Sequence, residues 1–194
     1  MVCVVGRMRD LILQLSKSSI YSTKPVMMKR VNTLNEVAVK DPLTGVNNRL
    51  GFSNKTKDYT QGSGASVIAI DVDFFKKIND FFGHGVGDEV LISLAHVINS
   101  CCRSEDIVCR FGGEEFVIFL PNTSVVTAER IAERIRSVIE STVFNNDLRV
   151  TISAGVATQT DPLSGIDFLL KNADDALYQA KGEGRNKVIV YSAI

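Results

Sequence analysis

The sequence predicts a mixed α/β domain in which helices pack on a single sheet. Apolar, β-branched runs alternate along the chain with stretches of helical periodicity, and a glycine pair separates two of the runs. The five predicted strands are 66–70, 107–111, 116–120, 149–157 and 187–191. A short helix is expected from Phe74, and longer amphipathic helices are expected over about 87–102, 124–141 and 166–181.

The glycine pair predicts a hairpin with an acidic tip. Gly112 and Gly113 separate the second and third strands, and both residues of a Gly-Gly turn can take positive φ without a steric clash. Glu114 and Glu115 follow at once. A glycine pair lets a phosphate approach the backbone, and adjacent carboxylates indicate a divalent metal. On this tract alone, a solvated turn with two surface glutamates is an equal alternative.

Two aspartates end the first predicted strand. Asp71 and Asp73 are two residues apart, so their side chains are expected on one face of the sheet. Mg²⁺ takes one or two carboxylates and completes its shell with water and substrate phosphates. Aspartates that face Glu114 and Glu115 would suit that ion. The alternative for Asp73 is that it caps the following helix.

Asn79 and Asp88 lie on either side of a glycine-broken turn. A carboxylate that accepts from N1–H and N2–H₂, with an amide bridging the same edge, fits guanine and leaves adenine poorly paired. Helix capping by Asp88 is an equal alternative. His84, in the same turn, has no second histidine nearby and is interpreted as structural.

Cations gather at the end of the last predicted helix. Lys181 and Arg185 are four residues apart, where they would either complement the helix dipole or hold a triphosphate. The tract from Arg103 to Asp106, just before the hairpin, is an ordinary charged loop when taken alone.

Composition excludes several classes. The chain has 194 residues, of which 45% are hydrophobic, and 22 basic residues balance 22 acidic ones, so no nucleic-acid partner is expected. No apolar stretch is long enough to span a bilayer. The four cysteines show no CxxC spacing and are interpreted as reduced thiols of a cytoplasmic protein.

The first 40 residues differ from the remainder. Met27, Val31, Leu34 and Ala38 form a heptad-like seam, which fits either a dimerising helix or one amphipathic helix packed on its own domain. We therefore expect an N-terminal helical and linker segment, 1–40, and a compact domain, 41–194.

The tracts together resemble the GGDEF diguanylate cyclase family. The resemblance covers residue 41 to the C-terminus and is carried, in the family's order and spacing, by segments 41–49, 71–76, 79–88, 110–116, 153–157 and 176–186. It implies a central, mostly antiparallel five-stranded sheet flanked by helices, similar to nucleotide cyclases and polymerase palm domains. It also implies that two domains face each other as a bacterial homodimer and condense two GTP into cyclic di-GMP and two pyrophosphates.

The resemblance also implies roles for individual residues. Asp71, Glu114 and Glu115 are expected to be the catalytic acids and, with the Val72 carbonyl, to bind two Mg²⁺ or Mn²⁺ ions per active site. Strand alternation leaves the roles of the two glutamates undivided. Substrate contacts are expected from Gly112, Gly113, Phe75, Lys76, Lys181 and Arg185, with guanine read by Asn79 and Asp88.

A separate site for the product is implied as well. Arg103 and Asp106 match the family's RxxD inhibitory site for cyclic di-GMP, and Arg134 is a guess for the second arginine. The alternative function is a non-catalytic cyclic di-GMP receptor that binds at Arg103 and Asp106. A GTP-binding interaction module, which would need no paired carboxylates, is a third hypothesis.

Overall fold

The computed structural model describes residues 38–57, 64–144, 147–159 and 165–192. The chain divides into two units, Met1–Ala38 and Val39–Ile194, and the second unit contains all the elements discussed below. Three residues of the predicted seam, Met27, Val31 and Leu34, lie outside the described residues, so the role of the seam stays a prediction. Within the described part of the chain, no helix is both long and apolar enough to cross a membrane.

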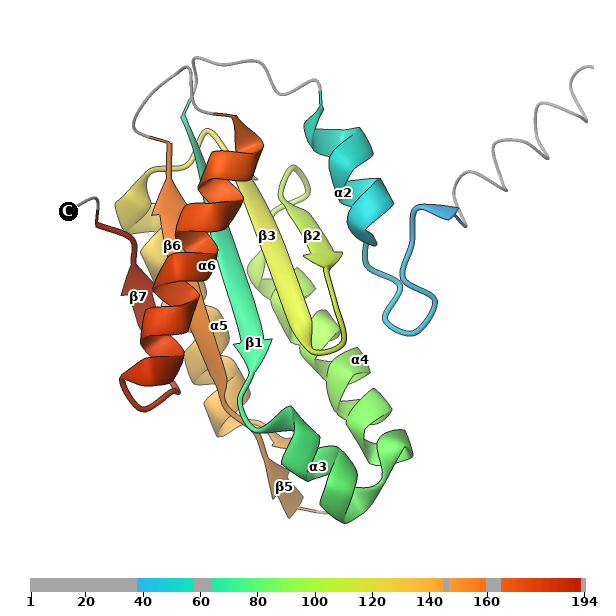
Figure 1. The fold of residues 1–194 in the computed structure, drawn as a ribbon. Helices are drawn as coiled ribbons and strands as arrows, with labels where there is room; N and C mark the ends of the chain where they lie inside the picture. The colour runs from blue at the N-terminus through green and yellow to red at the C-terminus, as the bar shows by residue number, and fades with distance from the viewer. Residues whose placement is uncertain (1–37, 58–63, 145–146, 160–164, 193–194) are drawn as a thin grey trace, which may run out of the picture. The chain divides into compact units, whose positions relative to one another are not determined.

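A five-stranded sheet forms the centre of the second unit (Figure 1). Its strand order is β2-β3-β1-β6-β7, and only the pairing of β6 with β7 is parallel. The predicted fold class is confirmed. The strands are β1 (Ala65–Val72), β2 (Ile107–Arg110), β3 (Glu115–Pro121), β6 (Ile152–Thr158) and β7 (Val188–Val190).

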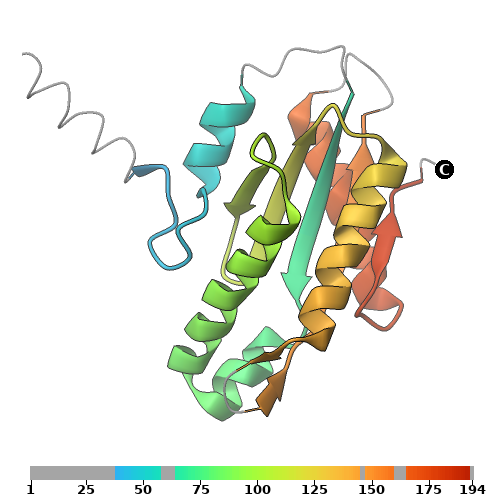
Figure 2. The ribbon, with the colours of Figure 1, turned by 180° about the vertical axis from the view of Figure 1, so that it is seen from behind.

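Helices cover both faces of the sheet. α4 (His84–Cys101) and α5 (Val125–Ser141) lie on one face of the sheet. Figure 2, turned by 180° from Figure 1, shows these two helices in front of the strands. α6 (Ile166–Gly182) lies on the other face, and α2 (Arg49–Thr56) contacts β2. Alternating residues of β1 serve the two layers, since Ile68, Ile70 and Val72 join the α4–α5 core while Ala65, Val67 and Ala69 join the α6–α2 core. Odd-numbered positions of β1 therefore face α6.

Two predicted boundaries were wrong. The helix expected from residue 87 begins at His84, because the break after α3 (Phe75–Phe82) is confined to Gly83, whose φ is 84°. The strand expected from residue 149 begins at Ile152. Arg149 belongs instead to β5 (Leu148–Arg149), which pairs with β4 (Val143–Phe144) in a separate two-stranded sheet.

The segment before α2 covers the outer edge of β2. Asn47 forms isolated bridges to Lys40 and to Cys109, and its side-chain amide donates to the Val108 carbonyl at 2.7 Å. An exposed strand edge invites pairing with other chains, so this contact protects the sheet. It also fixes the start of the domain beside the strand that leads into the acidic hairpin.

Candidate functional site

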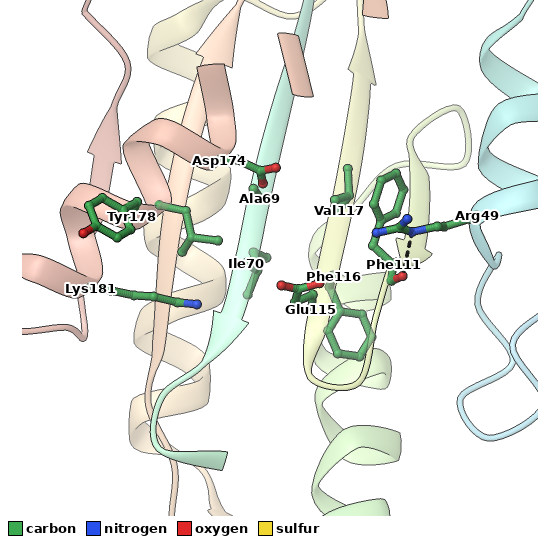
Figure 3. Close-up of a pocket in the computed structure, with 11 residues that line it drawn as sticks. Arg49, Ala69, Ile70, Phe111, Glu115, Phe116, Val117, Asp174, Tyr178 and Lys181 are labelled. Atoms are coloured by element: carbon green, nitrogen blue, oxygen red, sulfur yellow. Dashed lines mark hydrogen bonds between the residues drawn. The ribbon is translucent and has the colours of Figure 1, made fainter. Parts of the chain in front are cut away.

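The predicted acids meet where β1 and β3 come together. Asp71 and Glu115 are direct partners in the antiparallel register, so their side chains lie on the same face, toward α6. Figure 3 shows the Glu115 carboxylate between β1 and β3, with Lys181 of α6 extending toward the same place. Glu114 precedes β3, and its carbonyl accepts from the Val72 amide at 3.4 Å.

Lys181 forms an ion pair with Asp71. Its Nζ lies 2.7 Å from Oδ2 of Asp71, whose side chain is only 13% exposed. Burial raises the pKa of Asp71, Lys181 opposes that rise, and the charges of Glu114 and Glu115 add to it. The charges of Glu114 and Glu115 therefore disfavour the ionised form of the partly buried Asp71, and the Lys181 ammonium favours it.

This donor set fits a hard divalent cation. In the described residues, no three His, Cys, Asp or Glu side chains are arranged to hold a metal by themselves. Mg²⁺, however, needs only one or two carboxylates when water and substrate phosphates complete its shell. Asp71 and Glu115 can supply those carboxylates, and the Lys181 ammonium lies where a positive charge stabilises them.

The conformation predicted for the glycine pair was wrong. Neither Gly112 nor Gly113 has positive φ. Gly112 instead allows a close approach, because a Cβ there would lie 2.6 Å from Oε2 of Glu115, whereas a Cβ on Gly113 would meet nothing within 4 Å. The hairpin itself was predicted correctly. The reason given for Gly112, a positive φ, was wrong, because this glycine is needed for the close approach of Glu115.

Arg110 braces this hairpin. Its guanidinium donates to the Gly113 carbonyl from Nε at 2.9 Å and from Nη2 at 2.6 Å, and its Nη1 lies 3.1 Å from Oδ1 of Asp41. Burial alone would raise the pKa of Asp41, but hydrogen bonds from Thr44 and from Arg110 hold it below the usual value. The turn at the start of the domain is therefore tied to the acidic loop.

A pocket of about 230 Å³ adjoins the acids on the α6 face. Besides Glu115 and Lys181, its charged and aromatic lining comes from residues that the sequence interpretation did not single out: Arg49, Phe111, Phe116, Asp174 and Tyr178. Arg49 donates from Nε to the Phe111 carbonyl at 2.9 Å and lies over the Phe111 ring. Only Asp174 lies outside the motif segments, but no role was predicted for any of the five residues, and the fold brings them together from α2, the hairpin and α6.

Asp73 does not cap the following helix. Phe74 occupies the N-cap position of α3 without a side-chain cap, and Asp73 is buried. Its carboxylate accepts from Thr151 Oγ1 at 2.8 Å, from Ser153 Oγ at 2.7 Å and from the Asn186 amide at 3.0 Å. These bonds commit Asp73 to protein contacts, while Asp71 remains beside Glu115.

The two predicted guanine-reading residues lie on adjoining helices. Asn79 of α3 contacts α4, because a Cβ on Gly87 would lie 2.0 Å from its Oδ1. That oxygen is buried and has no hydrogen-bond partner among the described residues. Asp88 follows Gly87 within α4 and is exposed, so the proposed helix-capping role is wrong and the carboxylate is accessible.

The predicted phosphate-binding cations divide into two groups. Arg185 lies over the ring of Phe74, with its Cζ 4.7 Å from the centroid, and Lys77 lies 4.6 Å from the same centroid. Lys181 instead contacts Asp71. Lys76 is exposed on α3, and Phe75 is buried against the start of α4. The sequence interpretation predicted no role for Lys77 or for the Phe74 ring, which the structure places next to Arg185.

Arg103 and Asp106 form a tight turn after α4. The Arg103 amide donates to Oδ2 of Asp106 at 2.7 Å, and the Arg103 side chain is 60% exposed, 4.0 Å from Glu105. Arg134 donates to the Cys101 carbonyl, which brings it to the same corner of the domain. Burial and the nearby charge of Asp106 raise the pKa of Cys102 to about 12, so this thiol stays protonated.

Asp71→Asn should raise the thermal stability of the metal-free protein at pH 7. The pKa of Asp71 is higher in the folded state than in the unfolded state, so ionised Asp71 destabilises the fold. The folded protein therefore loses stability as pH rises from the unfolded pKa through the folded one. Asparagine resembles the protonated form. The melting-temperature difference should shrink as pH falls toward about 4, near the ordinary aspartate pKa.

Thermal unfolding with EDTA between pH 4 and 8 measures this difference. Asp73→Asn is the matched comparison, because it weakens a carboxylate that accepts three hydrogen bonds. It should therefore lower the melting temperature. If Asp71→Asn is also less stable at pH 7, the Lys181 ion pair outweighs the cost of burial.

The fold and the site together define the class of this chain. It is an α/β domain whose sheet carries a Gly-Gly-Glu-Glu-Phe hairpin opposite a strand that ends in aspartates. The family model described as "Diguanylate cyclase, GGDEF domain" matches residues 38–187. The chain belongs to the GGDEF diguanylate cyclase family.

Individual relatives agree with that assignment. The response regulator PleD of Caulobacter vibrioides is 44% identical over 164 residues, which cover 79% of this chain and 36% of PleD. Diguanylate cyclase DgcM of Escherichia coli K12 is 44% identical over 161 residues, which cover 80% of this chain and 39% of DgcM. This chain therefore spans little more than a third of either relative.

A solved structure shows the same fold. The coiled coil and GGDEF domain of DgcB from Caulobacter crescentus, in complex with c-di-GMP, superposes with a TM-score of 0.80 at 25% identity. The match covers 93% of this chain and 98% of that one.

Proposed function

We propose that this chain is a diguanylate cyclase domain, which condenses two GTP molecules into cyclic di-GMP and releases two pyrophosphates. One observation carries the proposal: in a GGDEF-family chain, Asp71 and Glu115 are register partners, and Lys181 contacts Asp71. Burial and the nearby charges of Glu114 and Glu115 disfavour the ionised form of Asp71, so its carboxylate is better explained by binding a cation than by stabilising the fold.

The metal would be held by Asp71 and Glu115, with Glu114 and the Val72 carbonyl nearby. When bound, Mg²⁺ or Mn²⁺ supplies charge stabilisation for the attacking and leaving oxygens of the phosphoryl transfer. Lys181 and Arg185 bind the phosphates in this proposal, and Lys181 exchanges Asp71 for a phosphate oxygen when GTP arrives.

In this proposal, residues of α3 and α4 select the guanine base. The Oδ1 of Asn79, which has no hydrogen-bond partner in the described part of the chain, and the exposed Asp88 carboxylate are acceptors. The Watson–Crick edge of guanine offers donors at N1 and N2. Adenine offers neither donor, so ATP would leave these acceptors unsatisfied. GTP is therefore the proposed substrate.

One experiment tests the proposal directly. The chain is incubated with GTP and Mg²⁺ at high protein concentration, and the nucleotides are separated by chromatography. Cyclic di-GMP with release of pyrophosphate is expected, together with little turnover of ATP. Absence of product with GTP, in a protein that still binds cyclic di-GMP, would instead identify a receptor.

The reaction requires two domains, and its rate should show this. Each domain holds one GTP, and the 3′-hydroxyl of each attacks the α-phosphate of the other. Specific activity should rise with protein concentration until the complex of two domains saturates, because two domains must associate before the reaction can occur. Tethering through residues 1–40, as predicted for the seam, would raise the effective concentration of the partner and shift this dependence to lower protein. Initial rate against enzyme concentration measures this; strict proportionality combined with a monomer in sedimentation would contradict it.

Product inhibition should depend on Arg103. Among the residues that the structure describes, its exposed guanidinium has only a long contact to Glu105, so it is available to the base of cyclic di-GMP. Arg103→Ala should weaken inhibition by roughly 10-fold to 100-fold, the usual effect of losing charge-assisted hydrogen bonds. Ser104→Ala is the control. Identical inhibition curves for Arg103→Ala and the unaltered chain would leave this turn without a role in binding the product.

A further inference from the structure

The loop between α6 and β7 holds Arg185 in a strained conformation. Gly184, Arg185 and Asn186 have consecutive positive φ values of 105°, 66° and 47°. Glycine adopts this region freely and asparagine tolerates it, but it is unfavourable for arginine. Neighbouring contacts must therefore offset the strain.

The first such contact is made by the Asn186 backbone. Its amide donates to Oδ2 of Asp73 at 3.0 Å. Asp73 is buried at the end of β1, and hydrogen bonds from Thr151 and Ser153 orient its carboxylate. The loop is thus attached to the strand that carries Asp71.

The second contact is made by the Asn186 side chain. Its Oδ1 accepts from Nη1 of Arg136 at 2.8 Å, and its Nδ2 donates to Oε1 of Glu140 at 2.7 Å. Arg136 lies on α5 with a side chain that is 15% exposed, and it is held by Glu133 at 2.6 Å and by Glu140 at 2.8 Å. We call Asp73, Arg136, Glu140 and Asn186 the Asn186 clamp.

The clamp determines where the Arg185 guanidinium lies. The residue after Asp73 is Phe74, which has φ of 57°, and the residue before Asn186 is Arg185. The bond between Asp73 and Asn186 therefore brings these neighbours together, and the Arg185 guanidinium lies over the Phe74 ring at 4.7 Å. The Arg185 guanidinium is thereby fixed over the ring of Phe74, which follows Asp71 by three residues.

We propose that the Asn186 clamp positions Arg185 to bind the phosphates of the nucleoside triphosphate. Asp73, Arg136 and Asn186 are positioning residues, because they act on the nucleotide only through Arg185. This inference rests on the proposed function and adds the chain's own device for ordering a phosphate-binding arginine, with α5 on the opposite face of the sheet as its support.

A double-mutant cycle tests the clamp in the full chain. Arg136→Gln should weaken binding of a non-hydrolysable GTP analogue with Mg²⁺ by between about 5-fold and 100-fold, the range expected when a binding group is misplaced. It should raise KM for GTP more than it lowers kcat. In an Arg185→Ala background, Arg136→Gln should change affinity by less than about twofold, because the group that it positions is already absent.

Arg130→Gln, which replaces an exposed arginine on the same helix, is the matched control and should bind as the unaltered chain does. Wild-type affinity for Arg136→Gln, or an equal loss in both backgrounds, overturns the clamp. If Arg136→Gln does not fold, Asn186→Gly replaces it, since glycine keeps the backbone conformation and removes both side-chain bonds. Asn186→Gly should then weaken binding in the unaltered chain and have less than about a twofold effect in the Arg185→Ala background. Equal effects in the two backgrounds would again overturn the proposal.

The unaltered chain separates the two hypotheses. If it binds the analogue but forms no cyclic di-GMP, the proposed reaction is wrong and the binding cycle still decides the clamp. If it forms cyclic di-GMP and the cycle is additive, only the clamp is wrong. A chain that binds no analogue overturns both.

Discussion

Glu115→Gln is expected to lower the rate of cyclic di-GMP formation by at least about 10²-fold, the usual effect of removing one charge-stabilising or acid–base group. Glu115 lies opposite Asp71 in the register and lines the pocket that Lys181 also lines. Asp71→Asn should have an effect of the same size, because it removes the other carboxylate of the pair. Initial rates with saturating GTP and Mg²⁺ measure both variants.

Both substitutions preserve side-chain size, so a folded protein is expected in each case. Glu129→Gln is the matched control, because Glu129 is exposed on α5, the helix on the opposite face of the sheet. Circular dichroism and the melting temperature establish folding before rates are compared. Near-wild-type rates in folded Glu115→Gln and Asp71→Asn proteins would remove these residues from the site.

The periodic parts of the fold were predictable because each depends on local sequence. The apolar positions of α5 follow a helical repeat, and Ser124 caps the helix by accepting from the Thr127 amide. The runs around Gly112 and Gly113 became β2 and β3 as expected. The continuous apolar run before Asp71 also placed this residue on the correct strand, because β1 is buried at every position up to Ile70.

What the sequence did not reveal depends on contacts between distant segments. Asp73 resembles a helix cap, yet its partners are Thr151, Ser153 and Asn186, which lie 78 to 113 residues further along the chain. Similarly, the sequence around Asp41 indicates only a turn, whereas in the structure Asp41 forms an ion pair with Arg110. No local pattern encodes such partners, so the acids were identifiable from sequence and the residues that orient their surroundings were not.

Gly87→Ala is expected to weaken binding of a GTP analogue by at least about 10²-fold, because guanine recognition depends on acceptors that a misplaced side chain no longer offers. An added Cβ would lie 2.0 Å from Oδ1 of Asn79 and 3.2 Å from Cζ of Phe75. The Asn79 side chain must therefore move. Selectivity for GTP over ATP should fall together with the affinity for the GTP analogue. Titration with the GTP and ATP analogues measures both changes.

Gly85→Ala is the matched control for this prediction. Gly85 belongs to the same first turns of α4, and a Cβ there would meet nothing within 4 Å. Alanine within a helix is more favourable than glycine by about 1 kcal/mol, so both variants should fold, and Gly85→Ala should bind GTP normally. A loss of affinity confined to Gly87→Ala implicates the position of Asn79. Equal affinity in both variants would contradict guanine recognition between α3 and α4, because the displaced amide would then have no part in binding.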